Sequence, residues 1–147
     1  MTSGNSLNLK LKTPGGVVTR AYMLDASGEK YKQLQLLNQA FSFEVDMSTL
    51  SCVSTGALYF LKMDDDGGTS RFPGNTAVAA YGTGYCDAQY QRTVMYINGA
   101  NLNNSYGACC AEKNIWEANS MTTANPTHSC TIDGQQRCIT DEDAVYN

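Results

Sequence analysis

The chain has 147 residues, a formal net charge of −4 and only 16% charged side chains. This mildly acidic balance lacks the basic footprint of a nucleic-acid-binding protein. No apolar run approaches the roughly 20 residues that a membrane-spanning helix needs, so neither a nucleic acid nor a membrane is an expected partner. The length suits a single domain.

Alternating apolar and polar residues predict a series of short β-strands along the chain. The segments with this pattern are 7–11, 17–24, 31–37, 41–45, 57–63 and 93–97. The third could also be a short helix, because its leucines fit helical spacing as well. The last ends at Asn98-Gly99, a strong hairpin turn signal. Strands this close together, without a sustained helical period, predict an antiparallel sandwich or barrel.

Six cysteines and a single histidine limit the metal chemistry open to the chain. No Cys-x-x-Cys pair is present, so we expect no zinc site. Disulfides formed in an oxidising compartment explain the cysteines better, although six cysteines allow fifteen pairings. The polar start, Met1 to Ser6, lacks the apolar stretch of a signal peptide. We therefore expect a fragment or a processed form of a secreted, extracellular protein.

Two glutamates five residues apart, Glu112 and Glu117, carry the strongest chemical signal in the sequence. A pair of carboxylates facing one sugar unit is the equipment of a retaining glycosidase. On a regular strand Glu112, Asn114 and Trp116 share one face and Glu117 lies on the other. The two glutamates can meet only if a one-residue bulge separates them. The alternative is two solvated glutamates around a buried Trp116.

Several motifs in the same order resemble the family 7 glycoside hydrolases, the fungal and protist cellulases. The resemblance covers nearly the whole chain. Its motifs lie at 40–46, 56–68, 81–89, 109–119 and 126–130. It implies a concanavalin-like β-jelly-roll sandwich of two curved antiparallel sheets, all-β and incomplete in this chain, with 1–147 as a fragment of a single glycoside hydrolase catalytic domain.

The resemblance also assigns roles to individual residues. Glu112 is implied to be the nucleophile, ionised by hydrogen bonding, and Glu117 the acid/base, kept protonated. Six further positions match those that line the family's glucan sites: Arg20, Tyr59, Tyr85, Asp87, Gln89 and His128. The partner implied is cellulose or another β-1,4-glucan, with no cofactor and no metal, and a monomer at full length.

The chain departs from the family in the middle of its catalytic motif. The family has Glu-x-Asp-x-x-Glu, and here Asn114 replaces the aspartate. An amide can still donate a hydrogen bond to Glu112 but adds no negative charge, so we expect reduced activity and a shifted pH optimum. A neutral substitution is the alternative. Lys113 is expected to point away from the cleft, with its stem reaching an edge of the sheet.

The cysteine pattern departs from the family too. The resemblance pairs Cys86 with Cys110. The residue that matches the usual partner of Cys109 is Tyr90, so Cys109 is expected to be free. The remaining three, Cys52, Cys130 and Cys138, match family cysteines whose partners lie beyond residue 147.

Mode of action depends on loop length in this family. Only a short polar segment, Ala100 to Ala108, precedes Cys109, where the cellobiohydrolases have a much longer loop. We therefore expect an endo-β-1,4-glucanase with an open groove. A cellobiohydrolase, a glucan-binding jelly roll without catalysis and a purely structural β-domain are the alternatives. The run Asp64-Asp65-Asp66 lacks the alternate spacing of a calcium loop, so we expect a solvated hairpin turn there.

Overall fold

The structure is a computed structural model that describes residues 2–10, 20–71, 73, 79, 84–88, 96–97, 100–101, 107–130 and 133–138. The regular elements within these ranges are all strands, which confirms the predicted all-β class. No helix there has the length and apolar character of a membrane span. The strands are β1 (Thr2–Ser3), β2 (Ser6–Leu7), β3 (Gly56–Leu61), β4 (Tyr96–Ile97), β5 (Ala100–Asn101), β6 (Gly107–Cys109), β7 (Glu112–Ala118), β8 (Thr123–Ala124), β9 (Thr127–His128) and β10 (Gln136–Cys138).

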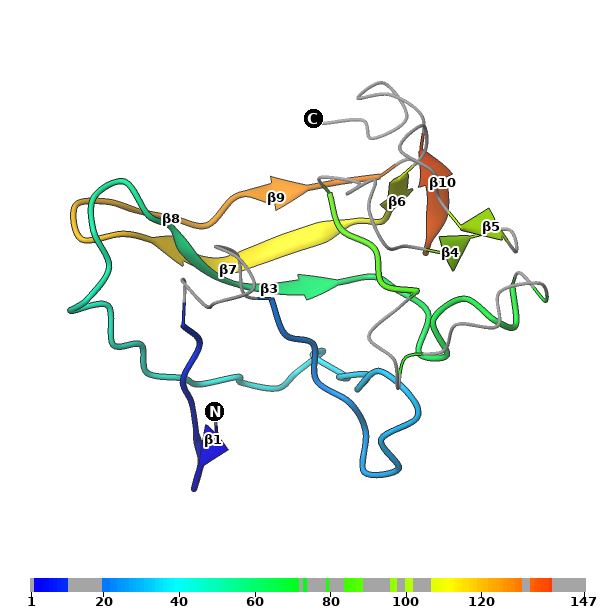
Figure 1. Ribbon diagram of the computed structural model, residues 1–147, viewed down its shortest axis with the longest axis horizontal. Helices are drawn as coiled ribbons and strands as arrows, with labels where there is room; N and C mark the ends of the chain where they lie inside the picture. Colours follow the sequence, from blue (N-terminus) through cyan, green and yellow to red (C-terminus); the bar gives the residue numbers. More distant parts are fainter. Residues whose placement is uncertain are drawn as a thin grey trace.

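A four-stranded antiparallel sheet built on β7 is the largest of the sheets described. β3 pairs with one edge of β7, and both β8 and β9 pair with the other. Figure 1 shows β9, β7 and β3 running side by side along the long axis of the molecule. Three smaller sheets have two strands each: β1–β2, β4–β5 and β6–β10.

The turn between β7 and β8 depends on one side chain. Asn119 Oδ1 accepts hydrogen bonds from the backbone N–H groups of Met121 and Thr122, at 2.8 and 3.0 Å. An asparagine that bonds the backbone two and three residues later is a turn former with a clear mechanism. Its amide nitrogen also donates to the carbonyl of Cys52 at 3.2 Å, which ties the turn to the segment before β3.

A small core lies beside the start of β7. Cys86, Ala108 and Cys110 are fully buried there, with Leu61, Met63 and Tyr85 packed against them. The segment 84–88 reaches this core through a close backbone approach. Gly84 has a φ of +70°, and a Cβ added to it would lie 2.2 Å from the carbonyl oxygen of Gly67. Only glycine fits this position, because it has neither the φ restriction nor the bulk of other residues.

The strand predictions are confirmed in part. The prediction for 57–63 matches β3, and β4 and β5 form an antiparallel pair around Asn98-Gly99, which lies outside the described residues. Of the segment 7–11, Leu7 alone among the described residues is in a strand, as the end of β2. The segment 17–24 contributes only the single bridge between Leu24 and Tyr31 within its described part. The prediction for 93–97 is described only at 96–97, where it matches β4.

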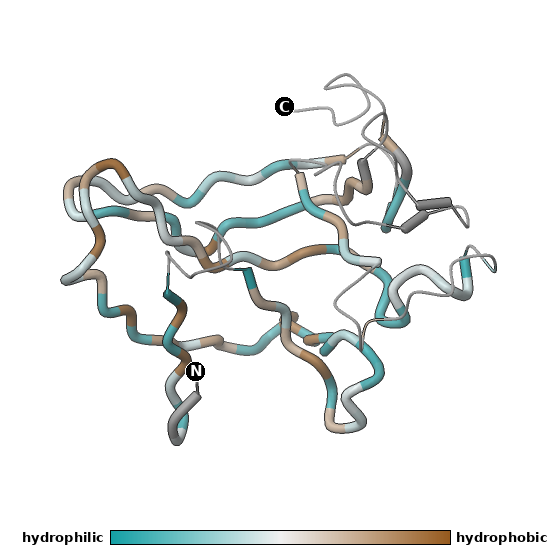
Figure 2. The backbone as a smooth tube through the Cα atoms, in the orientation of Figure 1, coloured by the Kyte–Doolittle hydropathy of each residue, from teal (hydrophilic) through white to brown (hydrophobic). Residues whose placement is uncertain are grey.

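Two strand predictions are wrong. The segment 31–37 is neither strand nor helix beyond the bridge at Tyr31, and 41–45 carries no strand assignment. Figure 2 shows hydrophobic and hydrophilic positions alternating along this extended stretch, which runs below β3 in the view. Its apolar side chains stay exposed, Phe41 by 45% and Phe43 by 39%. A strand needs a partner ladder as well as the alternating pattern, and the described elements provide none here.

Candidate active site

A β-bulge interrupts β7 between its two glutamates. β3 and β7 pair regularly on both sides of one irregular step. Tyr59 lies opposite Asn114, whereas the preceding residue of β3 lies opposite Trp116. Ile115 therefore has no partner across the ladder and is the extra residue of the bulge. The one-residue bulge that the sequence predicted is confirmed.

The bulge brings both glutamates to the same face of the sheet. Directly paired residues of neighbouring strands project to the same side. Glu112 pairs with Leu61, and Glu117 pairs with Ala57. These two β3 residues are an even number of positions apart, so they share a face. Asn114 joins them, because its β3 partner lies midway between the two. We call this the polar face.

Trp116 lies on the opposite, apolar face. A Cβ added to Gly56 would lie 3.1 Å from the indole of Trp116 and 3.1 Å from the side chain of Leu50. Trp116 is half-buried rather than buried. The bulge thus reverses the side on which simple alternation places this residue. The picture of two solvated glutamates around a buried tryptophan does not fit this arrangement.

The outer strands extend the polar face on the other side of β7. His128 on β9 pairs with Glu112, and Ala124 on β8 pairs with Glu117. Between these strands, the carbonyl of Pro126 accepts a hydrogen bond of 3.0 Å from the backbone N–H of Asn114. His128 therefore lies beside Glu112, on the same face, as its predicted role in substrate binding requires.

The segment 84–88 covers the N-terminal part of the polar face. The backbone N–H of Ala88 donates a hydrogen bond of 3.0 Å to Glu112 Oε2. Glu112 is 7% exposed and Asn114 3%. A buried carboxylate needs donors to replace the water that it loses, and the main chain of this segment provides one.

Backbone contacts and a disulfide join the same segment to β6 and β7. Asp87 forms a parallel bridge with Cys109. The N–H of Asp87 donates to Ala108, and its carbonyl accepts from Cys110, both at 3.4 Å. Cys86 and Cys110 form a disulfide with a Cα–Cα distance of 5.6 Å, which confirms the predicted pairing.

An ion pair packed against an aromatic ring forms the next part of the site. Arg20 pairs with the carboxylate of Asp87, whose side chain is 2% exposed. The guanidinium lies over the ring of Tyr85, 5.9 Å from its centroid, a cation–π distance. The ring of Tyr22 packs 4.9 Å from that of Tyr85 and 5.8 Å from that of Tyr31. The cluster joins residues that are far apart in the sequence.

The electrostatics of this cluster favour neutral tyrosines and a charged arginine. Burial raises the pKa values of Tyr22, Tyr59 and Tyr85. The charge of Glu112 raises that of Tyr59 further, which places this phenol within electrostatic range of the carboxylate. Burial alone lowers the pKa of Arg20, but the neighbouring phenols and carboxylate outweigh it, and the net pKa is raised.

Comparisons with known proteins show the family to which the chain belongs. The sequence model described as glycosyl hydrolase family 7 matches residues 1–145. The chain belongs to glycosyl hydrolase family 7. Among solved structures, a family 7 cellobiohydrolase from Daphnia pulex is 45% identical, with a TM-score of 0.71 over 80% of this chain and 30% of its own.

Endoglucanases of the family match equally well. Endoglucanase I complexed with cellobiose is 43% identical, with a TM-score of 0.71 over 82% of this chain and 30% of its own. The native endocellulase EGI from Humicola insolens is 39% identical, with a TM-score of 0.72 over 90% of this chain and 33% of its own. The chain thus spans about a third of the length of these structures and is a partial chain of the family's jelly-roll fold.

Asn114, the residue that departs from the family motif, lies buried between the two glutamates. Its backbone N–H is bonded to Pro126. Its Oδ1 atom is buried and has no hydrogen-bond partner within the described part of the chain. The predicted hydrogen bond from its amide to Glu112 stays a prediction, and the Ala88 N–H is the donor that the structure provides to that carboxylate.

Lys113 reaches the edge of the sheet, as the sequence predicted. Its Nζ atom donates to the carbonyl of Asn125 and to Thr127 Oγ1, both at 2.8 Å. The ammonium is therefore satisfied by the chain that enters β9. This contact holds β9 against β7, next to the pairing of His128 with Glu112.

Two cysteine predictions are wrong. Cys109 is not free, because it forms a disulfide with Cys138, at a Cα–Cα distance of 6.0 Å. The antiparallel pairing of β6 with β10 brings the two together, and the 6.0 Å is within the usual range for a disulfide. Cys138 therefore needs no partner beyond residue 147. Cys52 and Cys130 are free thiols, the first exposed and the second half-buried.

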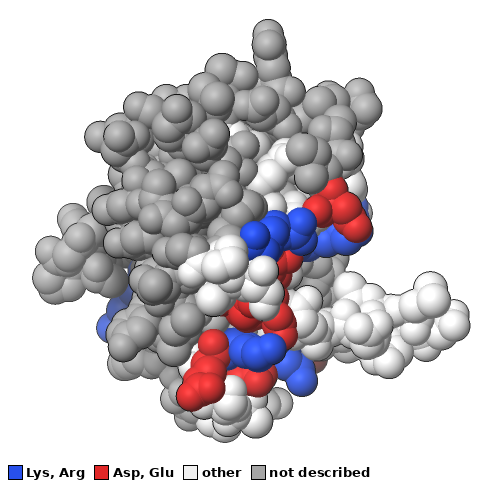
Figure 3. Space-filling model, turned by 90° about the vertical axis from the view of Figure 1, so that its right-hand side faces the viewer, with Lys and Arg blue, Asp and Glu red and all other residues white. Residues whose placement is uncertain are grey.

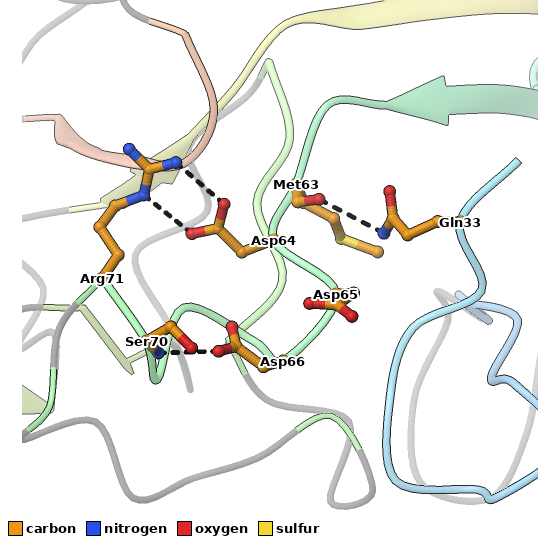
Figure 4. A pocket seen from close by; sticks show the side chains of 7 residues that line it. All are labelled: Gln33, Met63, Asp64, Asp65, Asp66, Ser70 and Arg71. Carbon is orange, nitrogen blue, oxygen red and sulfur yellow. Dashed lines mark hydrogen bonds and ion pairs between the residues drawn. The ribbon is translucent and has the colours of Figure 1, made fainter. Parts of the chain in front are cut away.

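A surface pocket of about 530 Å³ lies next to the acidic run and is drawn in Figure 4. Residues 65–71 form turns here, which confirms the predicted turn at Asp65 and Asp66. It is not a hairpin among the described residues, because the preceding strand, β3, pairs with β7. Asp64 accepts two hydrogen bonds from Arg71, at 2.9 and 3.0 Å, and Asp65 pairs with Lys30 at 2.9 Å. Asp66 Oδ2 accepts from the backbone of Ser70 at 2.7 Å. Protein donors therefore occupy all three carboxylates.

Acidic and basic side chains lie next to one another on the face of the molecule shown in Figure 3. Exposed ion pairs of this kind contribute little to stability. Among the described residues, no group of three or more His, Cys, Asp or Glu side chains could hold a metal ion.

The structure brings together most of the residues predicted for the site. Glu112, Asn114 and Glu117 share a face with Tyr59 and His128, and Arg20, Tyr85 and Asp87 form the adjoining cluster. Gln89 lies outside the described residues. Sequence reasoning missed Ala88, which acts through its main chain and leaves no side-chain signal. It also missed Tyr22, which belongs to the cluster of Arg20 and Tyr85. Its only signal in the sequence was its position within the alternating segment 17–24.

Proposed function

We propose that the protein is a retaining glycoside hydrolase that cleaves β-1,4-glucosidic bonds of cellulose by double displacement. The observation that carries the proposal is the bulge at Ile115, which turns Glu112 and Glu117 to one face of the sheet. A retaining mechanism needs two carboxyl groups about 5–5.5 Å apart on either side of the bond that is cleaved. Their partners on β3 are four positions apart, roughly 13 Å at about 3.3 Å per strand residue. The two long glutamate side chains therefore have to lean toward each other across the position of Asn114 to reach that spacing.

Each glutamate has a defined task. Glu112 attacks the anomeric carbon and forms a glycosyl–enzyme ester, while Glu117 gives its proton to the departing glycosidic oxygen. Glu117 then removes a proton from water, the resulting hydroxide displaces Glu112 from the anomeric carbon, and both carboxyls return to their starting states. The Ala88 N–H, which donates to its carboxylate, favours Glu112 as the nucleophile, and the greater exposure of Glu117 suits proton exchange with water.

The residues around the glutamates suit a sugar chain. Arg20, Asp87 and His128 offer hydrogen-bonding groups, and Tyr59 and Tyr85 offer rings with neutral phenols. A glucan presents hydroxyl edges and apolar faces, and mixed aromatic and polar surfaces complement both. Gln89 is proposed to complete the set.

Turnover of an aryl cellobioside by the complete catalytic domain that contains these residues tests the proposal. The Glu112→Gln variant is expected to lose at least a thousandfold in rate, since the amide cannot form the ester. Unchanged turnover in this variant, or none in either protein, would favour a glucan-binding jelly roll without catalysis.

An endo-acting enzyme with an open groove is the mode of action that we favour over a cellobiohydrolase. The support is the short connection between β5, which ends at Asn101, and β6, which begins at Gly107. Both endoglucanases and a cellobiohydrolase are among the similar structures. On soluble carboxymethylcellulose, an endo enzyme lowers viscosity steeply for each reducing end formed. Slow viscosity loss with release of cellobiose would overturn the endo assignment.

The disulfides and the proposed substrate also indicate where the protein acts. Two disulfides are typical of proteins of oxidising compartments, and an insoluble polysaccharide is degraded outside the cell, so we expect secretion. We expect residues 1–147 to be part of a single catalytic domain, active as a monomer. Size-exclusion chromatography with light scattering on the complete domain checks the oligomeric state.

A further inference from the structure

The hydrogen bond from the main chain of Ala88 to Glu112 is placed to control the geometry of the reaction. Donor and acceptor are 3.0 Å apart, and the two residues are 3% and 7% exposed. A hydrogen bond to a charged acceptor is stronger than one between neutral groups. Because it engages Oε2, it leaves Oε1 as the oxygen for attack. Its donor is a peptide group, which cannot change rotamer as a side-chain donor can.

Independent contacts fix the position of this peptide group. The disulfide Cys86–Cys110 lies two residues before it, and the backbone bridge of Asp87 to Cys109 lies one residue before it. The side chain of Asp87 pairs with Arg20. At the start of the segment, Gly84 packs directly on the backbone of Gly67. A segment held at so many points keeps a donor in place far better than a free loop does.

We propose that the Ala88 amide is the positioning group of the nucleophile, and that the contacts of segment 84–88 exist in part to hold it. The inference rests on the proposed function, because it assigns the orientation of Glu112 that the first displacement needs. Ala88 does not touch the reacting atoms and acts through Glu112 alone. Misplacing a reacting group by about 1 Å can reduce a rate a hundredfold.

The test measures formation of the glycosyl–enzyme in the complete catalytic domain. The probe is a 2-deoxy-2-fluoro-cellobioside with a dinitrophenolate leaving group, which forms the ester and then hydrolyses slowly. Intact-protein mass spectrometry gives the rate constant of labelling at saturating probe and the final fraction labelled. Partial unfolding lowers the labelled fraction but not the rate constant of the folded molecules, so the two effects separate.

The decisive variant replaces Ala88 by lactic acid, which turns the peptide bond into an ester and removes only the N–H donor. We expect labelling about 10- to 100-fold slower, as for loss of one hydrogen bond to a charged group, with the labelled fraction kept. Ala88→Pro also removes the donor and is expected to be at least as slow. Ala88→Gly keeps the donor and is expected to stay within about threefold of the parent rate.

Labelling of the lactic acid variant within threefold of the parent would overturn the inference. So would an equal loss in Ala88→Gly, because the methyl group and not the N–H would then matter. Glu112→Gln separates this inference from the proposed function. If that variant is not labelled while the lactic acid variant keeps its rate, only the inference fails. If Glu112→Gln is labelled like the parent, the nucleophile assignment itself is wrong.

Discussion

The two faces of the β3–β7 pair differ in how far the chain itself covers them. On the polar face Glu112 and Asn114 are 7% and 3% exposed, beneath the tethered segment 84–88. On the apolar face Leu58 is 36% exposed, and Phe41, which packs 5.5 Å from the ring of Phe60, is 45% exposed. The chain spans about a third of the solved structures that it matches.

The difference separates a feature that residues 1–147 form by themselves, the position of Glu112, from one that needs further segments of the domain, the covering of the apolar face. The orientation of Glu112 depends on contacts within this chain, so the proposed nucleophile is positioned locally. The apolar face resembles one half of a sandwich core, and we expect further segments of the domain to cover it. Exposed apolar faces and open strand edges promote aggregation, so residues 1–147 alone are expected to be poorly soluble and inactive.

The largest effect on stability is expected at the contact between Gly84, at the start of segment 84–88, and the backbone of Gly67. Gly84→Ala should lower the free energy of unfolding by about 4 kcal/mol, because it combines an unfavourable φ with a clash against Gly67. Gly28→Ala is the matched control, since its φ is +74° but nothing lies within 4 Å; it should cost about 1–2 kcal/mol. Denaturant titrations of the complete domain measure both variants. Equal losses would mean that Gly84 does not pack tightly on Gly67.

The apolar face should respond almost as strongly once the domain is complete. Phe41→Ala is expected to lower the free energy of unfolding of the complete domain by about 3 kcal/mol, the cost of emptying a core position. The control is the exposed Met121, on the β7–β8 turn. Met121→Ala should change the free energy of unfolding by less than about 0.5 kcal/mol. A loss below 1 kcal/mol for Phe41→Ala would show that this face stays uncovered.

A smaller effect is expected from the residue that departs from the family motif. Asn114→Asp adds negative charge beside the centre that becomes positive in the transition state, and we expect about a tenfold gain in kcat, the equivalent of one pKa unit of interaction. The added charge opposes ionisation of neighbouring carboxyls, so the pH–rate profile should move to higher pH. Neither a gain in rate nor a shift of the profile would mean that the asparagine is a neutral substitution.

The smallest effect concerns the tyrosine cluster. The folded protein raises the pKa of Tyr22, so above pH about 10 the folded state holds a proton that the unfolded state loses. The stabilisation is complete below that pH and is lost as the pH rises, by up to roughly 1.4 kcal/mol per pH unit. Tyr22→Phe should reduce this alkaline loss in denaturant titrations at several pH values. An unchanged slope would place the phenol in water.

Chemistry made the centre of the site predictable from sequence. Two glutamates five apart cannot act together on a regular strand, so the need for a bulge followed from strand geometry, and Ile115 meets it. The expectation that Lys113 reaches an edge of the sheet followed in the same way from the cost of burying an ammonium. Family resemblance added the roles of the glutamates and the Cys86–Cys110 pair.

Long-range pairing is what the sequence could not provide. Phe41, Phe43 and Val45 alternate like a strand, but a ladder also needs a partner, which alternation does not reveal. The family resemblance left Cys109 free, because Tyr90 stands where the family has its usual partner. The pairing of β6 with β10 decides the actual partner, Cys138. The Ala88 donor belongs to the main chain, which every residue carries, so only its position makes it special.

The configuration of the first product tests the central claim most directly. Proton NMR follows the new reducing ends that the complete domain releases from a soluble β-1,4-glucan oligosaccharide, before mutarotation. Two glutamates on one face of a bulged β7 predict net retention, so the β-anomer should form first and the α-anomer only later. If the α-anomer forms first, the enzyme inverts, and the assignment of Glu112 as a nucleophile is wrong.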